Sequence, residues 1–172
     1  LTYEVHGRKQ LHEPGQLVIA NHPTLIDVIF LVACVPNAVC VVKESLLRRF
    51  GVGALLRQAG YVGNASDPLM SLEACVAALR SGATLIMFPE GSRSTPGSLR
   101  RLRRGAAYVA LAAQIELTPV HISCAPSTLT KTEHWYDVPH RRTHFVISVG
   151  DRIPVDADGA ASSPRLTAQA IT

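Results

Sequence analysis

Residues 67–88, DPLMSLEACVAALRSGATLIMF, read as a helix followed directly by a strand. Asp67 and Pro68 supply an N-cap and a first-turn proline, and apolar residues then recur at helical spacing. The pair Ser81-Gly82 ends this pattern. The run Thr84–Phe88 is short, apolar and bounded by turn residues, which predicts a buried strand.

The same alternation continues on both sides of this stretch. It predicts strands at Leu17–Ala20, Val39–Val42, Leu117–Ile122 and Phe145–Val149, with weaker ones at Tyr3–Val5 and Tyr61–Val62. It predicts helices at Leu25–Ala33, Val52–Gln58 and Gly105–Ala113, and a short one after Pro164 in a loop-like tail. This alternation predicts the α/β fold class, with a mixed, mostly parallel sheet flanked by helices.

Length and composition indicate one domain with a core of its own. The chain has 172 residues, of which 47% are apolar and 17% charged, so disorder is excluded. The apolar stretch 25–42 could span a bilayer by length, but Asp27 and Pro36 interrupt it, which favours a buried helix followed by a strand. Because the chain begins at Leu1 in strand-like sequence, we expect residues 1–172 to be a single catalytic domain without its N-terminal membrane-anchoring segment.

The cysteines and the charged residues indicate which kinds of site and partner the chain can have. The four cysteines show no CxxC spacing and are expected to be buried thiols: Cys34, Cys40, Cys75 and Cys124. The net charge is +4, with basic clusters at Arg48, Arg49, Arg93, Arg100, Arg101, Arg103 and Arg104. Such clusters favour a phosphate or anionic lipid as partner. Nucleic acid is disfavoured because only 5% of residues are aromatic.

The first candidate site is Asn21-His22-Pro-Thr-Leu-Ile-Asp27 at the carboxyl end of a predicted strand. We expect Pro23 to open a helix with Asp27 one turn inside it, so that the carboxylate reaches back to the imidazole. His22 would then act as a general base. The alternative is a turn-capping histidine with Asp27 on the helix surface.

The second candidate site is Phe88-Pro-Glu-Gly-Ser-Arg-Ser94, also after a strand. Gly91 would permit close approach of a ligand, and Arg93 could hold an oxyanion with two hydrogen bonds. The alternative is an ordinary turn with a surface salt bridge.

Together the two motifs resemble those of the PlsC-like glycerophosphate and lysophosphatidate (1-acylglycerol-3-phosphate) acyltransferase family. Asn21 to Asp27 matches its NHxxxxD motif, and Phe88 to Ser94 matches FPEGTRS with Ser92 in place of threonine. Gly97-Ser-Leu99 and Leu102-Arg-Arg-Gly105 are similar to GxLxxFKxG, and Thr118-Pro119-Val120 to (V/I)PV. The resemblance covers roughly Leu17 to Ser123.

The resemblance implies an O-acyltransferase with the fold of this family, acting in phospholipid biosynthesis. His22 would be the general base and Asp27 its orienting partner, with Asn21, Glu90, Gly91, Ser92, Arg93 and Arg103 in the acceptor site. A hydroxyl would attack the thioester of acyl-CoA or acyl carrier protein, without a metal or other cofactor. We expect the oxyanion donors among backbone N–H groups at the start of the helix after His22.

One departure from the family pattern concerns the acceptor. The family commonly has an arginine in a GxxFIDR pattern, whereas Gly60-Tyr-Val-Gly-Asn-Ala-Ser66 has none. Lys43 could supply the charge instead, or could be a solvated strand-end lysine. The alternatives are therefore a non-glycerophosphate acceptor (glycolipid, polyene or aminolipid) and a non-catalytic lipid-binding domain. A hydrolase is disfavoured by the lack of a GxSxG elbow.

The acceptors and products of such a family are amphiphiles, so we also expect a membrane surface as a partner. The arginine cluster at residues 100–104 would attract anionic lipid, with each basic side chain contributing about 1 kcal/mol. The expected location is the cytoplasmic face of a membrane.

Overall fold

The computed structural model describes residues 1–64, 67–93, 102–134 and 136–155. Within these ranges, seven strands form one sheet in the order β1-β7-β6-β2-β5-β3-β4. The strands are β1 Thr2–His6, β2 Leu17–Ala20, β3 Ala38–Lys43, β4 Val62–Asn64, β5 Thr84–Met87, β6 Leu117–Ala125 and β7 His144–Val149. The helices are η1 Arg8–His12 (a 3-10 helix), α1 Asp27–Cys34, α2 Glu44–Leu47, α3 Val52–Gln58, α4 Pro68–Arg80 and α5 Gly105–Ala113.

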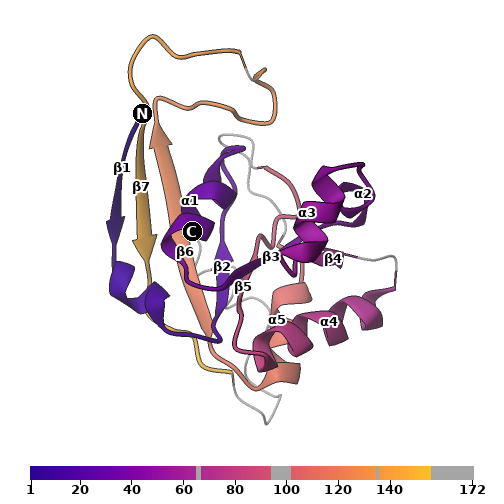
Figure 1. Ribbon diagram of the computed structural model, residues 1–172. Helices are drawn as coiled ribbons and strands as arrows, with labels where there is room; N and C mark the ends of the chain where they lie inside the picture. The colour runs from indigo at the N-terminus through magenta and orange to yellow at the C-terminus, as the bar shows by residue number, and fades with distance from the viewer. Residues whose placement is uncertain (65–66, 94–101, 135, 156–172) are drawn as a thin grey trace.

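The sheet is mixed and mostly parallel, which confirms the expected fold class. Strands β6, β2, β5, β3 and β4 run in one direction, and β7 pairs antiparallel with β6. Strand β1 pairs in parallel with β7, so β1 and β7 form a reversed edge (Figure 1).

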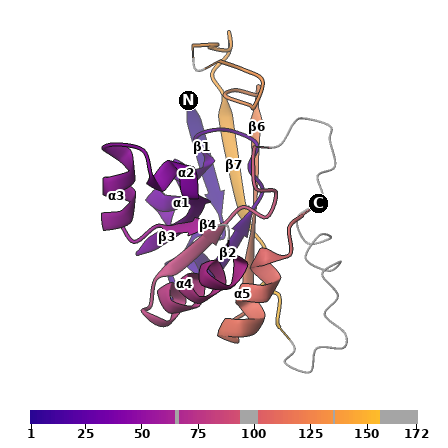
Figure 2. The same ribbon diagram turned by 90° about the vertical axis from the view of Figure 1, so that its right-hand side faces the viewer.

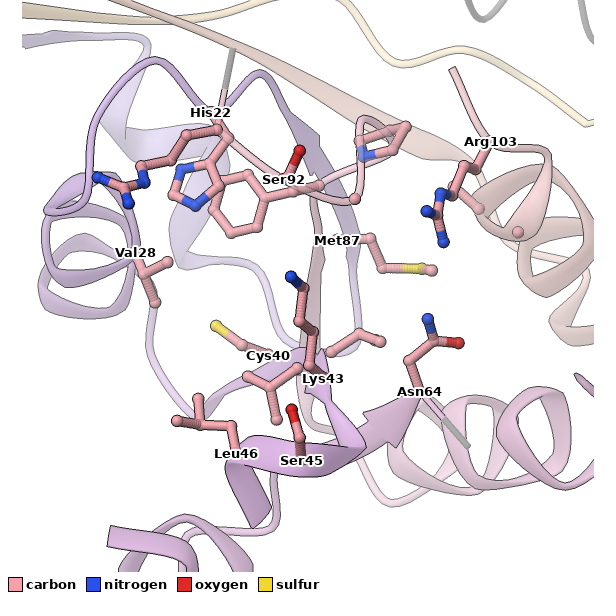
Figure 3. Close-up of a pocket in the computed structure, with 18 of the residues that line it drawn as sticks. His22, Val28, Cys40, Lys43, Ser45, Leu46, Asn64, Met87, Ser92 and Arg103 are labelled. Atoms are coloured by element: carbon pink, nitrogen blue, oxygen red, sulfur yellow. The ribbon is translucent and has the colours of Figure 1, made fainter. Parts of the chain in front are cut away.

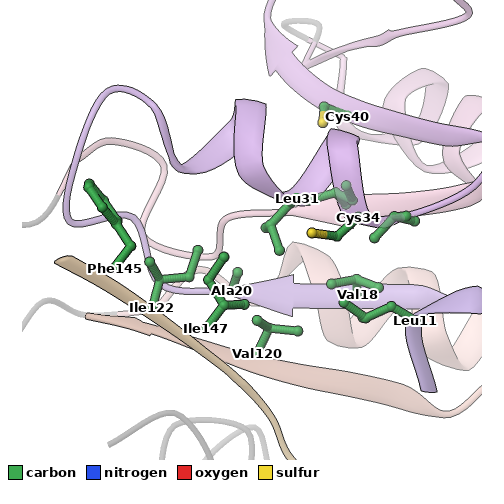
Figure 4. Close-up of a cluster of buried hydrophobic side chains, with 12 residues drawn as sticks. Leu11, Val18, Ala20, Leu31, Cys34, Cys40, Val120, Ile122, Phe145 and Ile147 are labelled. Atoms are coloured by element: carbon green, nitrogen blue, oxygen red, sulfur yellow. The ribbon is translucent and has the colours of Figure 1, made fainter. Parts of the chain in front are cut away.

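Both faces of the sheet are covered, and the central strands are therefore apolar on both sides. Val18 and Ala20 of β2 lie in a cluster with Leu31 and Cys34 of α1 (Figure 4). Leu17 and Ile19 of the same strand belong to the opposite cluster, whose helical members come from α4 and α5: Cys75, Leu79, Ala106, Val109 and Ala110. In Figure 2 the helices α4 and α5 lie side by side below the sheet.

Most of the predicted elements are present, several with the expected bounds. Helices α3 and α5 agree to the residue, and Asp67 caps α4 by accepting a hydrogen bond from the Leu69 N–H at 2.8 Å. The stretch 25–42 forms α1 and β3, as expected. The short helices η1 and α2 were not predicted because each is only about one turn long. The expected helix after Pro164 lies outside the described residues.

One prediction about α1 is wrong. Pro23 does not open the helix, which begins at Asp27 with Ile26 as its N-cap. The chain between His22 and Asp27 is instead a turn, held by hydrogen bonds from Thr24 to the Asp27 carboxylate.

The cysteines are free thiols, of which Cys34, Cys40 and Cys75 are buried and Cys124 partly so. In the part of the chain that the structure describes, no helix is long and apolar enough to cross a bilayer.

Candidate active site

The two sequence motifs meet because their strands are neighbours. Strands β2 and β5 pair in parallel, with Ile19 opposite Met87. His22 follows β2 and Phe88 follows β5, so both motifs leave the sheet at the same carboxyl edge. The Phe88 ring packs against the His22 imidazole with a centroid distance of 4.5 Å.

His22 and Asp27 form a hydrogen-bonded pair. His22 Nδ1 lies 3.0 Å from Asp27 Oδ2, and the Asp27 side chain is 0% exposed whereas that of His22 is 16% exposed. With a proton on Nδ1, the ring donates to the carboxylate and leaves the basic Nε2 on the opposite edge. Among the described residues nothing bonds Nε2, and His22 lines the cavity described below. The alternative of a surface aspartate is therefore wrong.

Thr24 holds the Asp27 carboxylate in place. Its hydroxyl donates to Oδ1 at 2.6 Å, and its backbone N–H donates to Oδ2 at 2.7 Å. Thr24 is completely buried. The carboxylate thus receives three hydrogen bonds, one of them from His22, and this compensates for its burial. The sequence analysis did not single out Thr24, although a threonine three residues before an aspartate is a recognisable turn signal.

Asn21 fastens the end of β2 to β6. Its side-chain amide donates to Ile122 O at 2.8 Å, and its side-chain carbonyl accepts from the Ile122 N–H at 2.6 Å. Both polar ends of the side chain are thus bound to backbone. These contacts support a positioning role for Asn21 rather than the substrate-binding role assigned from the sequence.

The second motif supports the first from β5. Glu90 Oε1 accepts a hydrogen bond from the His22 backbone N–H at 3.1 Å, which ties the two loops together. Gly91 has a φ of 69°, a conformation that favours glycine. A Cβ atom there would lie 2.8 Å from Arg103 Nε. Gly91 therefore allows close approach of Arg103, and it also lines the cavity described below.

Arg93 anchors the loop that follows β6 at the same carboxyl edge of the sheet. Its Nη1 donates to Leu129 O at 3.0 Å and to Thr130 O at 2.8 Å, both in the β6–β7 connection. Leu129 O also accepts from the Leu25 N–H at 3.0 Å. The arginine thus holds the segment that carries Lys131, a cavity residue that no sequence motif indicated.

These loops border a cavity of about 890 Å³ (Figure 3). Its charged lining side chains are all basic: Lys43, Arg49, Arg93, Arg103 and Lys131. Its apolar lining includes Leu25, Val28, Leu46 and Met87, and Ser92 also lines it. A lining of this composition fits an amphiphile with an anionic group.

The labelled residues occupy distinct parts of the cavity. In Figure 3 the Lys43 amine extends into the middle, with His22 on one side and Arg103 on the other. Val28 and Leu46 lie on the His22 side, and Asn64 lies near Arg103. Lys43 is therefore a cavity residue, and as the exposed last residue of β3 it is also in contact with solvent.

Cys40 is the one cysteine that lines the cavity. Burial raises the pKa of its thiol to about 11, although a hydrogen bond with Tyr61 opposes the rise. At neutral pH the thiol is protonated and is a weak nucleophile. A covalent route through Cys40 is therefore disfavoured.

Three backbone N–H groups before α1 are engaged within the protein. The backbone N–H groups between His22 and α1 already have acceptors, which are Asp27 Oδ2 for Thr24, Leu129 O for Leu25 and Thr24 Oγ1 for Ile26. The turn uses these three N–H groups to fix the aspartate and the β6–β7 connection. The helix itself starts at Asp27, and Val28 in its first turn lines the cavity, so the oxyanion role of N–H groups at the start of α1 stays a prediction.

The model of the Acyltransferase family matches residues 2–123. The chain belongs to this family. The matched region contains both motif loops, so the family resemblance noted in the sequence is confirmed.

Curated relatives point to one group of enzymes within the family. The chain is 27% identical to human "1-acyl-sn-glycerol-3-phosphate acyltransferase beta", over 96% of this chain and 61% of the relative. It is 28% identical to the mouse alpha enzyme, over 87% of this chain and 55% of the relative. The chain thus spans somewhat more than half the length of these relatives.

A solved structure shares the fold. The 1-acyl-sn-glycerophosphate (LPA) acyltransferase PlsC from Thermotoga maritima superposes with a TM-score of 0.72 at 22% identity, covering 98% of this chain and 67% of that one. This likeness shows that the chain has the same fold as that structure.

Proposed function

We propose that the chain transfers a fatty acyl group from an acyl thioester, acyl-CoA or acyl carrier protein, to a hydroxyl of a lysophospholipid-like acceptor. The observation that carries the proposal is the His22–Asp27 pair, fixed by buried hydrogen bonds at the wall of a cavity that is both apolar and cationic. The names of the similar proteins support the same reaction.

In this mechanism His22 acts as the general base. Nε2 takes the proton of the acceptor hydroxyl as the oxygen attacks the thioester carbonyl carbon. Throughout the reaction Asp27 accepts the hydrogen bond from His22 Nδ1–H, and it stabilises the imidazolium that forms. When the tetrahedral intermediate collapses, the C–S bond breaks and the leaving thiolate takes the proton from His22. No group of the protein is acylated in this scheme.

The basic residues would bind the anionic part of the acceptor. Lys43 extends into the middle of the cavity and Arg103 lies at the end away from Val28 and Leu46 (Figure 3). A phosphate near these two cations would place the acceptor's acyl chain toward the apolar end. The Lys43 amine extends into the middle of the cavity and would also serve the oxyanion, beside backbone N–H groups at the start of α1.

A non-glycerophosphate acceptor is the second candidate. Asn64, the last residue of β4, lines the cavity in the stretch where the family pattern has an arginine. A neutral amide can hydrogen-bond to the hydroxyl groups of a glycolipid, whereas it carries no charge to pair with a phosphate. A non-catalytic lipid-binding domain would use the cavity but would not need the ordered His22–Asp27 pair.

The deciding experiment compares acceptors with and without the phosphate group. The release of free CoA is measured with 1-acylglycerol-3-phosphate and with the corresponding monoacylglycerol, for the wild type, Lys43→Met and Arg103→Met. We expect the phosphate acceptor to be preferred by the wild type and the preference to fall about tenfold or more in each variant, as for loss of a charge-assisted contact.

Three other outcomes are informative. No acceptor-dependent CoA release with any acceptor or donor would contradict the proposed function. Equal use of both acceptors, unchanged in the variants, would favour the second candidate. Activity with acyl carrier protein but not with CoA would fix the donor.

We further propose that the reaction takes place at the cytoplasmic face of a membrane, because acceptor and product are amphiphiles. The arginines expected to attract anionic lipid include Arg100 and Arg101, which lie outside the described residues, and Arg103 and Arg104, which lie within them.

A further inference from the structure

The helices α2 and α3 form a short hairpin that projects beside the β3–β4 edge of the sheet (Figures 1 and 2). Its turn and the first part of α3 expose three large apolar side chains: Phe50 is fully exposed, Val52 is 50% exposed and Leu55 is 66% exposed. We call residues 48–55 the α2–α3 tip. Exposed apolar side chains gathered within eight residues of sequence are uncommon on a soluble surface and indicate a contact.

The tip is a built feature of the fold. Gly51, with φ 73° and ψ −69°, forms a γ-turn closed by the Val52 N–H donating to Phe50 O at 2.9 Å. A Cβ atom on Gly53 would lie 2.1 Å from Leu47 O, so the two helices approach more closely than any side chain would allow. The Arg57 guanidinium also donates to Leu47 O. These contacts hold the turn in a shape that leaves Phe50 in solvent.

The charges of the tip select its partner. Arg48 and Arg49 precede Phe50, and both are exposed. The nearby acid Glu44 pairs with Arg48, with Oε1 lying 3.4 Å from Arg48 Nε. Arginines flanking an exposed phenylalanine fit the interface of an anionic bilayer, where the ring reaches the acyl boundary and the guanidinium groups meet phosphates.

The tip is continuous with the cavity. Ser45, Leu46 and Arg49 belong to the same hairpin and line the cavity wall. A lipid entering beside the hairpin would therefore pass from the bilayer to the wall of the cavity along one structural element.

We propose that the α2–α3 tip docks the protein on an anionic membrane by inserting Phe50, Val52 and Leu55 at the boundary between head groups and acyl chains. Arg48 and Arg49 then lie among the lipid phosphates. The docked hairpin delivers the amphiphilic acceptor to the cavity, a role that rests on the proposed acyl transfer.

The first test is vesicle co-sedimentation of the 172-residue chain with phosphatidylglycerol–phosphatidylcholine vesicles. The double variant Phe50→Ser/Leu55→Ser should bind at least tenfold more weakly than the wild type, because two exposed apolar anchors are lost. The matched control is Leu69→Ser on α4, since Leu69 is 61% exposed but belongs to another surface. The control should bind like the wild type. Equal loss in the control, or no loss in the double variant, would overturn the proposal.

A second measurement does not depend on loss of binding. The variants Phe50→Trp and Leu69→Trp each add one tryptophan to Trp135. The fluorescence added by Phe50→Trp should be quenched by vesicles whose acyl chains carry bromine, whereas the fluorescence added by Leu69→Trp should not. Failure of Phe50→Trp to be quenched while the protein is bound would overturn the insertion. If the double variant lost binding to acyl carrier protein but still bound vesicles, the tip would be a protein-docking surface. That result would also overturn the proposal.

An activity assay distinguishes failure of this inference from failure of the proposed function. With a soluble short-chain acceptor the double variant should keep its turnover, because neither residue lines the cavity. With an acceptor embedded in vesicles its apparent KM should rise about tenfold. If the wild type transfers no acyl group to any acceptor, the proposed function fails even where vesicle binding depends on Phe50.

Discussion

The turn between β2 and α1 and the α2–α3 tip both border the cavity, but their side chains are held very differently. In the turn, Asp27 and Thr24 are buried and hydrogen-bonded to each other, and His22 is bonded to the aspartate. In the tip, the backbone is fixed by a γ-turn, but Phe50 projects into solvent. Proton transfer requires a base in one orientation, whereas capture of a fluid lipid requires exposed apolar surface. The proposed reacting centre is therefore buried and fixed, whereas the proposed docking surface is exposed.

The largest effect is expected when the two residues of the proposed reacting centre, His22 and Asp27, are replaced. We expect His22→Ala to lower kcat by about 10²–10⁴-fold and Asp27→Asn to lower it by a similar factor, because the hydroxyl lacks a base or the base lacks its orienting partner. CoA release under single-turnover conditions measures both. The double variant should be no slower than His22→Ala alone, since the pair acts as a unit. Near-normal transfer by folded His22→Ala would show that His22 is not the base.

Thr24 tests whether rigidity of the turn matters to the chemistry. Thr24→Val keeps the shape but removes the hydroxyl that donates to Asp27 Oδ1, so we expect kcat to fall about tenfold and the unfolding free energy to fall by about 2 kcal/mol. Thr24→Ser retains the hydroxyl and should restore most of both. A Thr24→Val protein as stable and as active as the wild type would mean that the backbone N–H alone orients the carboxylate.

Arg93 combines features of the two regions, since it lines the cavity and also anchors a loop. Arg93→Lys should raise the acceptor KM by roughly tenfold with a smaller change in kcat, because the shorter lysine lacks the planar guanidinium that places Nη1 against both Leu129 O and Thr130 O. Lys131→Met should change KM in the same direction, because the held segment carries Lys131.

An unchanged KM and kcat in Arg93→Lys would exclude this role for the arginine. An effect confined to the carrier-protein donor would instead assign Arg93 to the donor site.

The smallest effect is expected at Cys40, a cavity residue outside both regions. Burial raises the pKa of its thiol to about 11, so the protonated thiol takes no covalent part in transfer at neutral pH. Cys40→Ala should keep activity within about threefold and lose about 1 kcal/mol of unfolding free energy from the small void. A loss of activity comparable with that in His22→Ala would point to an acylated cysteine, which mass spectrometry of the quenched reaction would detect.

The sequence alone determined the elements and the two motif loops. Helices α3 and α5 and strand β2 have the bounds predicted from periodicity, because the strands are continuous apolar runs and the helices end at turn residues. The HxxxxD spacing places His22 and Asp27 within five residues, so their pairing needs only local geometry. These features are local and can be read from neighbouring residues.

Only the tertiary structure decided what surrounds the pair. The occupied backbone N–H groups before α1, the binding of Arg93 to the β6–β7 connection, and the entry of Lys131 into the cavity all join segments far apart in the chain. Sheet pairing brings these segments together, and no local pattern encodes it. The exposure of Phe50 was hidden for the same reason, since an apolar residue beside a helix is usually assigned to the core until its neighbours are known.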